Sequence, residues 1–320
     1  MSVLVTGSVA IDHIMVFEDR FKNHVLADKL HMINVAFLVP SLEKRWGGTG
    51  ANIAFNLKQL GEDPILLATV GPDLGPYANW LDDHEISREW LVELKDAFTA
   101  QCFITTDLDN NQLTSFHPGA MDRAHEARID SVSAPIEVGI VSPNGKQGMI
   151  EYAQVLKERK IPCVVDPGQG LPMFDGPELL ELMNDASVFV VNDYEWSLTL
   201  EKTGLSESAI AERVGALIVT RGGDGSRVIR GRPDLGVAVE DPQAEIPVVK
   251  AESVVDPTGC GDAYRSGLLY AMARGLPLET GARLGSLMGS LKVARPGPQS
   301  IDCGLESIRD QFAQHFGYGF

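Results

Sequence analysis

The sequence predicts a layered α/β fold with a mostly parallel central sheet and a small inserted β-sheet. Short, continuous apolar runs recur along the chain, and segments with helical spacing separate them. Continuous apolar runs are typical of strands that are covered on both faces, as in a parallel sheet. Two stretches interrupt this alternation with extended, partly alternating sequence. They favour a β-sheet flap that projects from the main body.

The predicted elements follow one another in a regular order. Five runs that end at small or polar residues are strand candidates: Val3–Val5, Val138–Val141, Cys163–Val165, Val188–Val191 and Leu217–Val219. Helical patterns are found at Ala51–Leu60, Gln147–Lys160, Pro177–Asn184, Glu195–Lys202 and Ser206–Val214, and another continues to about Arg274. Strands that alternate with helices in this way indicate repeated βαβ units.

The flap is predicted from residues of about 13–46 and about 99–118. Asp109-Asn110-Asn111 is a turn signal, so a hairpin is expected across Gln101–His117. The chain contains no repeat and no long linker. We therefore expect one domain over residues 1–320, with the flap acting as its lid rather than as an independent domain.

Composition narrows the classes of partner. The formal net charge of −17 disfavours nucleic acid and anionic membranes. No stretch approaches the roughly 18 apolar residues that span a bilayer. The four cysteines are widely spaced, which favours reduced thiols. The N-terminus enters a strand directly and lacks a signal-peptide pattern. A cytoplasmic enzyme is the resulting expectation.

The segment Asp256–Asp262, sequence DPTGCGD, carries the strongest chemical signal. Its glycines allow several backbone N–H groups to point at one spot, and the helix that starts behind them adds a positive dipole end. Such a turn binds anions. A carboxylate inside it repels the ligand, which suggests that Asp262 accepts a proton from a hydroxyl while the turn holds a transferred anionic group. This combination indicates phosphoryl transfer.

Two motifs near the N-terminus have the residues of a sugar site. Gly47–Asn52, sequence GGTGAN, precedes a helix and offers close backbone approach and the Asn52 amide; its alternative is a glycine-rich turn with a helix cap. Asp12 follows the first strand, where ligands of open α/β sheets gather. It could accept hydrogen bonds from vicinal hydroxyls, or it could be a surface or capping residue.

Two later motifs suggest a nucleotide and metal site. Asn192 and Glu195 follow a predicted strand, and an amide with a carboxylate at this spacing can hold hydrated Mg²⁺ through water. The alternative is an ordinary helix N-terminus. The segment Thr220–Gly225 also follows a strand and is rich enough in glycine to pass under a nucleotide, although a hairpin turn would look the same. Neither a dinucleotide-binding fingerprint nor a P-loop is present.

Taken together, the motifs resemble the ribokinase-like, PfkB-type family of carbohydrate and nucleoside kinases. The family's two signatures match GGTGANIA from Gly47 and the segment Asp256–Asp262, and the segment Val70–Gly75 and the Asn-x-x-Glu motif match as well. The resemblance covers essentially the whole chain, in the expected order. It implies a three-layer, Rossmann-like sheet with a small β-sheet lid, and ATP-dependent transfer of phosphate to an alcohol.

The resemblance also implies a role for each matching position. Asp262 would be the catalytic base, with an anion hole formed by the N–H groups of Gly259, Cys260 and Gly261. Substrate binding falls to Ser8, Asp12, Gly48 and Asn52. ATP binding falls to Asn192, Thr220, Gly222 and Gly225, and Glu195 would organise Mg²⁺, mainly through water. Whether a monovalent cation is needed as well stays open, as does the choice between monomer and homodimer.

The chain departs from the family pattern at Cys260, where alanine is commoner, and more mildly at Pro257. A cysteine is small enough to keep the geometry of the turn. A thiol at a helix N-terminus is expected to have a lowered pKa and to be open to oxidation.

The acceptor is predicted to be a purine ribonucleoside, that is adenosine, inosine or guanosine. The Tyr264–Gly267 and Phe116–Ala120 segments look like the nucleoside-kinase branch, and Phe103 and Phe116 on the flap are candidates for stacking on a base. These rings could instead form the flap's own core or a dimer contact. A ribose- or fructose-type sugar kinase is the alternative, and a non-catalytic sensor is a third reading. The intact Asp262 argues against a sensor.

Overall fold

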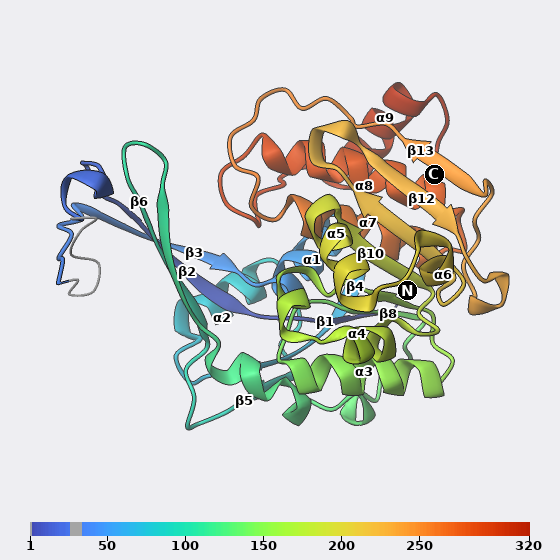
Figure 1. The fold of residues 1–320 in the computed structure, drawn as a ribbon, viewed down its shortest axis with the longest axis horizontal. Coiled ribbons are helices and arrows are strands. Elements are labelled where there is room, and N and C mark those ends of the chain that lie inside the picture. Colours follow the sequence, from blue (N-terminus) through green and yellow to red (C-terminus); the bar gives the residue numbers. More distant parts are fainter. Residues whose placement is uncertain (1, 26–33) are drawn as a thin grey trace.

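The body of the protein is a twisted, mostly parallel sheet in the computed structural model, which describes residues 2–25 and 34–320 (Figure 1). In this described part, nine strands lie in the order β13-β12-β11-β10-β9-β8-β1-β4-β5. Their bounds are Gln243–Ile246, Ser226–Arg230, Ala216–Thr220, Val188–Asn192, Cys163–Val165, Val138–Val141, Ser2–Thr6, Asp63–Val70 and Leu91–Glu93. Only the pairings of β12 with β11 and β13 are antiparallel within this sheet as described.

Helices cover both faces of this sheet. The bounds of α1 to α9 are Thr49–Gln59, Gly75–Asp83, Lys146–Glu158, Gly176–Met183, Asp193–Thr203, Glu207–Ala211, Cys260–Ala273, Leu278–Val293 and Leu305–Phe316. One core contains residues of α1, α7 and α8, and the other contains residues of α3, α4 and α5. The layers are therefore helix, sheet, helix, as predicted. Among the described residues no helix is long and apolar enough to cross a membrane.

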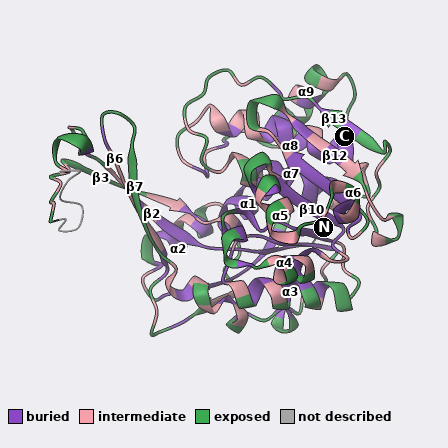
Figure 2. Ribbon diagram, viewed as in Figure 1, coloured by how far each residue is buried: buried purple, intermediate pink, exposed green. Residues whose placement is uncertain are grey.

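The two cores explain why the strand sequences are continuously apolar. In β10, Val188 and Val190 point into the core with α7, whereas Phe189 and Val191 point into the core with α3 and α4. All four side chains are buried, and the central strands are buried throughout their length (Figure 2). Each such side chain contributes about 1.5–3 kcal/mol by leaving water. A strand that is buried on both faces does not alternate between apolar and polar residues. The continuous apolar runs therefore predicted these strands correctly.

All five predicted body strands are present, extended by at most one residue at an end. The predicted helices are also present, although Ser206–Val214 shortens to Glu207–Ala211, since the chain must enter β11. The sequence reasoning did not assign β4, β5, β12, β13, α2, α8 or α9. Helix α8 was missed because it is rich in small residues, and β12 and β13 because charged residues interrupt them.

A separate four-stranded sheet in the described chain has the order β3-β2-β6-β7, with bounds Ser41–Gly47, Ala10–Val16, Ala100–Thr106 and Gln112–His117. It projects away from the body in Figure 1. Most of the predicted flap segments belong to it, including the hairpin. Residues 17–25 and 34–40 are not strands, and 26–33 lie outside the described residues. Whether this sheet moves as a lid stays a prediction.

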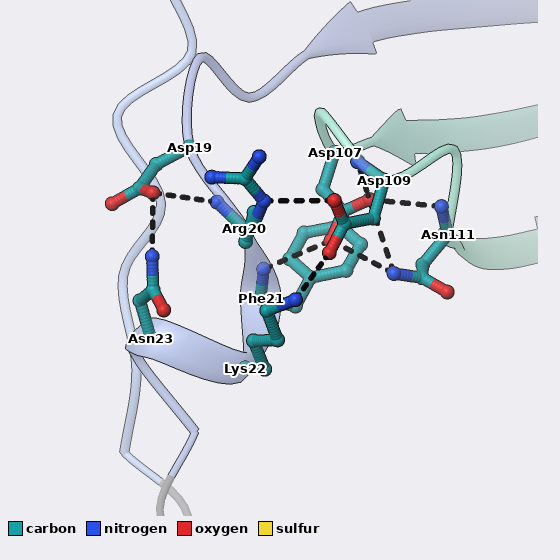
Figure 3. Close-up of polar contacts among 8 residues, drawn as sticks. All are labelled: Asp19, Arg20, Phe21, Lys22, Asn23, Asp107, Asp109 and Asn111. Atoms are coloured by element: carbon teal, nitrogen blue, oxygen red, sulfur yellow. Dashed lines mark hydrogen bonds and ion pairs between the residues drawn. The ribbon is translucent and has the colours of Figure 1, made fainter.

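The far end of this sheet, the flap tip (residues 17–24 and 107–111), is fastened by carboxylates (Figure 3). Asp107 is buried and accepts hydrogen bonds from the backbone N–H groups of Phe21, Asp109 and Asn111 at 3.0, 2.9 and 2.8 Å. Burial opposes its ionisation, but bonds from the side chain of Asn111 and from these amides outweigh burial and lower the pKa of Asp107 to about 2. Asp109 holds Arg20 and Lys22, each at 2.7 Å.

The flap tip should therefore come apart locally when Asp107 loses its charge. In the Asp107→Asn variant, a neutral amide with one acceptor oxygen replaces a carboxylate that accepts from four donor groups. We expect amide hydrogen exchange of residues 108–111 to accelerate about tenfold or more, since a hydrogen bond to a charged group contributes about 1.5–3 kcal/mol. Exchange of the body sheet should not change. The control is Asp96→Asn, which removes an exposed ion pair with Arg123; equal acceleration in both variants would contradict the assignment.

Candidate active site

The candidate site lies where the strand order reverses. From β1 the chain continues to β4 on one side and later to β8 on the other, so the carboxyl ends of β1 and β8 flank a topological switch point. The segment after β1 meets the start of α1 there: Ser8 Oγ accepts a hydrogen bond from the Thr49 N–H at 3.0 Å. Helices α1 and α7 pack against each other beside this point. Two sequence motifs 200 residues apart are thereby brought together.

The turn before α7 has the geometry of an anion cradle. Gly259 has a φ of 81°, a conformation that glycine adopts without strain, and α7 begins at Cys260. Within the described chain, the N–H of Cys260 bonds to the Pro257 carbonyl at 3.2 Å, and the hydrogen bonds found include none from the N–H groups of Gly259 or Gly261. These two donors are directed at the helix end, where an anion would be favoured.

Asp262, in the first turn of α7, is only partly accessible. Its Oδ2 accepts a hydrogen bond from Asn52 Nδ2 at 2.7 Å. Burial raises the pKa of Asp262 to about 7, against the opposing effects of the Asn52 hydrogen bond and the charge of Arg265. A carboxylate with a pKa near neutrality exchanges protons readily with a hydroxyl in its site. The predicted base thus has the environment that such a role needs.

A chain of hydrogen bonds, which the sequence did not reveal, holds Asn52 in place. Gln299 Nε2 donates to Asn52 Oδ1 at 3.0 Å and to the Tyr77 hydroxyl at 2.7 Å. Trp80 Nε1 donates to Gln299 Oε1 at 2.7 Å, and the Tyr77 hydroxyl donates to the Gly47 carbonyl at 2.8 Å. Because both oxygen and nitrogen of Asn52 are engaged, its amide is oriented toward Asp262. The glycine-rich segment, α2 and the segment between α8 and α9 all contribute.

Asp12 lies at the base of the flap. It is opposite Arg45 in the register of β2 and β3 and opposite Cys102 in β6. Burial raises its pKa to about 6, Arg45 lowers it, and Asp256 raises it. The hydrogen bonds found among the described residues include none to its carboxylate. Asp12 therefore keeps acceptor oxygens that a sugar hydroxyl could use.

Ser8 and Gly48, predicted to bind substrate, have structural duties here. The Ser8 hydroxyl is engaged by the first amide of α1, and its side chain is buried. Gly48 has a φ of 91°, and a Cβ there would approach the Ser8 carbonyl oxygen to 2.4 Å. A glycine is therefore needed for the turn itself. A backbone contact between Gly48 and a ligand stays a prediction.

A buried ion pair lies below Asp262 and was not predicted. Arg265, one turn further along α7, donates from Nε and Nη2 to the two oxygens of Asp166 at 2.8 and 3.1 Å. Both side chains are buried. Asp166 follows β9 directly, so only the fold shows its proximity to α7. The two parallel hydrogen bonds satisfy the donors and acceptors of the pair. The pair has no net charge, and it lies beside Asp262, the carboxylate that is predicted to change its protonation state.

Asn192 and Glu195 form a capping box at α5. Asn192 Oδ1 accepts from the Glu195 N–H at 2.8 Å, and Glu195 Oε2 accepts from the Asn192 N–H at 2.8 Å. The alternative prediction for these two residues, an ordinary helix N-terminus, is thus correct. Glu195 is buried, and burial, followed by the charge of Asp166, raises its pKa. The capping box uses one oxygen of each side chain. The second carboxylate oxygen of Glu195 could therefore still bind the water shell of Mg²⁺.

The described residues contain no cluster of three or more potential metal ligands. Mg²⁺ in nucleotide sites is commonly held by one or two carboxylates together with phosphate oxygens and water. Glu195 and Asp166, whose charge raises the pKa of Glu195, follow the carboxyl ends of β10 and β9 and fit such a donor set.

The predicted nucleotide loop lies at the same edge of the sheet. Thr220 ends β11 beside Asn192 of β10. Gly222 and Gly225 have positive φ values of 52° and 82°. A Cβ at Gly222 would have no protein atom of the described residues within 4 Å. The loop leads into the antiparallel strand β12, so the hairpin-turn reading of this segment is realised too.

The flap aromatics divide between two places. Phe17 and Phe37 pack with Phe21 at the flap tip, which agrees with the reading that they form the flap's own core. Phe116 is opposite Cys102, so it lies on the Asp12 face of the sheet. The neighbouring position, Phe103, lies on the other face and stacks on His13 with ring centroids 4.5 Å apart. The structure therefore does not bring Phe103 to the Asp12 face, because side chains alternate along a strand.

The expected lowering of the Cys260 pKa is wrong. Burial raises the pKa of this thiol, and the nearby Lys292 opposes that effect without overcoming it. The helix dipole is thus outweighed by loss of water. A raised pKa makes Cys260 a poor candidate for a reactive thiolate.

With this geometry established, solved structures with the same fold are informative. The nucleoside kinase of Burkholderia thailandensis in complex with inosine is 44% identical, covers 100% of this chain and 99% of its own, and superposes with a TM-score of 0.85. The ribokinase of Thermotoga maritima shares 18% identity, covers 98% of this chain and 99% of its own, and has a TM-score of 0.76, which shows the fold alone. The class is therefore an ATP-dependent kinase with the ribokinase-like fold.

The family follows from the sequence comparisons. The model of the pfkB family carbohydrate kinases matches residues 2–303. The nucleoside kinase of Methanocaldococcus jannaschii is 30% identical over 284 residues, which is 88% of this chain and 90% of that protein. This chain belongs to the pfkB family of carbohydrate kinases, and its similarities lie with the nucleoside kinase branch.

The pKa of Asp262 has a consequence for stability. Its value in the folded protein, about 7, lies above the ordinary 3.8, so the wild-type protein loses stability as the pH rises through that range. We expect Asp262→Asn to melt at a higher temperature than the wild type at about pH 8, with a gap that shrinks toward about pH 4. Thermal melting without ligands measures this gap.

A control with the opposite sign is available in Asp82→Asn. The Arg88 hydrogen bond lowers the pKa of Asp82, so this variant should be less stable than the wild type at neutral pH and should converge with it in acid. A gap for Asp262→Asn that does not change with pH would contradict the perturbed pKa.

Proposed function

We propose that this kinase transfers the γ-phosphoryl group of ATP to the 5′-hydroxyl of a purine ribonucleoside. One observation carries the catalytic part of the proposal. The Asp262 carboxylate, with a pKa near neutrality, lies in the first turn of a helix beside the N–H groups of Gly259 and Gly261, for which no acceptor is found among the described residues. A proton acceptor and a cradle for negative charge thus occupy one helix end, as transfer to an alcohol requires.

The proposed reaction uses these groups in a defined order. The 5′-oxygen loses its proton to Asp262 and attacks the γ-phosphorus in line, while the bond from phosphorus to the β,γ-bridging oxygen breaks and ADP leaves. The N–H groups at the start of α7 stabilise the charge on the transferred group. Asn52 holds the carboxylate of Asp262 through Nδ2. Positioning and charge stabilisation supply most of the acceleration in phosphoryl transfer.

The remaining residues would position the two substrates. The free carboxylate oxygens of Asp12 would accept hydrogen bonds from ribose hydroxyls, and Gly48 would offer backbone contact. Thr220, Gly222 and Gly225 would lie along ATP. Mg²⁺, when bound, would neutralise phosphate charge, with Glu195 and Asp166 holding its water shell and Asn192 near the phosphates.

Two observations favour a purine nucleoside over a free sugar, and one disfavours a sugar phosphate. Phe116 is half exposed on the Asp12 face of the flap, where a ring can stack on a base. Arg45, the basic group nearest Asp12 in the strand register, is already paired with Glu43 at 2.8 Å and Asp256 at 3.1 Å, which leaves little for a sugar phosphate. The Burkholderia relative was solved with inosine, and also with ADP and inosine. A ribose- or fructose-type acceptor is the alternative.

Removal of the proposed base should separate binding from turnover. We expect Asp262→Asn to reduce kcat by roughly 10²–10⁴-fold, the range for loss of a general base. The Kd of the nucleoside, measured by calorimetry, should change little because the amide keeps the shape of the side chain. Near-wild-type turnover would exclude Asp262 as the base. The matched control is Asp193→Asn, an exposed acid at the start of α5.

The wild-type enzyme should show a corresponding pH dependence. Asp262 acts in its ionised form, so kcat/KM should fall about tenfold per unit as the pH drops below about 7. A profile that is flat down to about pH 5 would argue against this role.

The acceptor is tested with adenosine, inosine, guanosine, cytidine, ribose and fructose in the presence of ATP. We expect the purine ribonucleosides to have the highest kcat/KM. Phe116→Ala should raise the KM for them by about tenfold, since base stacking contributes about 1–3 kcal/mol, whereas Phe103→Ala on the opposite face should not. Preference for a free sugar would overturn the purine assignment while leaving the kinase class intact.

A further inference from the structure

Lys292, near the end of α8, is a fully buried lysine without a role in the reaction described above. Its Nζ donates hydrogen bonds to two backbone carbonyl oxygens, that of Asp256 at 2.8 Å and that of Arg295 at 3.1 Å. Asp256 opens the segment that ends in Asp262. Burial of an ammonium group costs free energy unless its N–H donors are hydrogen-bonded. The two carbonyl oxygens therefore make this position suitable for a lysine.

The residues that follow Lys292, segment 293–298, contact the anion-binding turn and support it. The N–H groups of Val255 and Asp256 both donate to the Val293 carbonyl, at 2.8 and 3.1 Å. The N–H of Gly297 donates to Asp256 Oδ2 at 2.9 Å. A Cβ at Gly259 would come within 2.7 Å of Pro298, so the turn rests directly on this segment. Lys292 lies where the two segments, 255–259 and 293–298, converge.

The surroundings of Lys292 resemble a binding site for a small cation that is formed by backbone carbonyl groups. Two carbonyl oxygens face the ammonium, as they would face a small cation. Burial lowers the pKa of Lys292, while Cys260 and Asp256 favour its charged form and Arg45 opposes it. Arg45 is itself paired with the Asp256 carboxylate. The positive charge thus lies beside the turn whose N–H groups receive the anion.

We propose that the Lys292 ammonium acts as a built-in monovalent cation, which fixes the carbonyls of Asp256 and Arg295 and thereby positions the Gly259–Gly261 turn. Lys292 is a positioning residue, because it acts through the turn and does not reach the reacting atoms. Turnover by the wild-type enzyme then needs no added potassium or other small cation. This inference rests on the proposed role of the turn as an anion hole.

The first test uses the wild-type protein. Its kcat is measured with the best nucleoside acceptor and ATP·Mg²⁺ while potassium, ammonium or sodium replaces tetramethylammonium, which is too large for the site, at constant ionic strength. We expect the rate to vary by less than about twofold, far below the effect of losing a catalytic donor. A wild-type enzyme that requires added potassium would overturn the proposal.

The second test removes the charge of Lys292 in two ways, one that leaves a cavity and one that fills it. Lys292→Ala leaves a cavity lined by two carbonyl oxygens, and kcat should fall about 10- to 100-fold, somewhat less than for complete loss of an anion-hole donor. Ammonium or potassium should restore most of this loss. Lys292→Met, which fills the space with an apolar chain, should lose as much and should not respond to cations. Equal insensitivity of both variants to every cation would contradict the inference.

A readout independent of turnover separates this inference from the proposed function. Ammonium or potassium should raise the melting temperature of Lys292→Ala more than that of the wild type, whichever acceptor the enzyme uses. The matched control is Lys202→Ala, because Lys202 in α5 also donates to two carbonyls, those of Phe174 and Pro172. Its loss should leave both kcat and the cation response unchanged. A cation response shared by both alanine variants would count against a specific site.

Discussion

The hydrogen bond from Asn52 Nδ2 to Asp262 Oδ2 is the contact on which the arrangement of the site depends. It joins α1 to α7, that is, the glycine-rich motif to the anion-binding turn. Asn52 can make it only because Gln299 and its partners fix the amide from the other side. The bond lowers the pKa of a carboxyl that burial would otherwise raise further. Removal of water and one oriented donor together set Asp262 near neutrality.

Several groups near this contact bear charge, and nearly all are neutralised in pairs. Asp166 pairs with Arg265, and Asp256 with Arg45. Lys292 is satisfied by carbonyl dipoles rather than by a carboxylate. Asp12, Glu195 and Asp262 take part in none of the ion pairs found among the described residues, and the pKa of each is raised, to about 6 for Asp12 and about 7 for Asp262. Perturbed acids of this kind are frequent in functional sites, and Asp12 and Asp262 are the two that are proposed to act on the acceptor.

The sequence motifs contain several of the acids and amides of the candidate site, but not the residues that hold them in place. Asp262, Asn52 and Asp12 stood in recognisable motifs, and the glycines of the turns mark conformations that other residues avoid. Gln299, Tyr77, Asp166 and Arg265 carry no local signal, because each is defined by a partner far away in the chain. The pKa of Cys260 was misjudged for the same reason: the helix dipole is visible in sequence, whereas burial is not. Phe103 and Phe116 were separated only by strand register.

By itself, the sequence determined the layered α/β class, the body strands from their continuous apolar runs, and the glycine-containing turn in front of α7. These are local properties, set by side-chain burial and backbone conformation over a few residues. Only the tertiary structure decided which distant groups meet: that Asn52 faces Asp262, that Lys292 lies beneath the turn, and that Asp12 shares a face with Phe116. The first two contacts arise from packing α1, α7 and α8 on one side of the sheet, and the third from the register of the flap strands, neither of which a short window of sequence specifies.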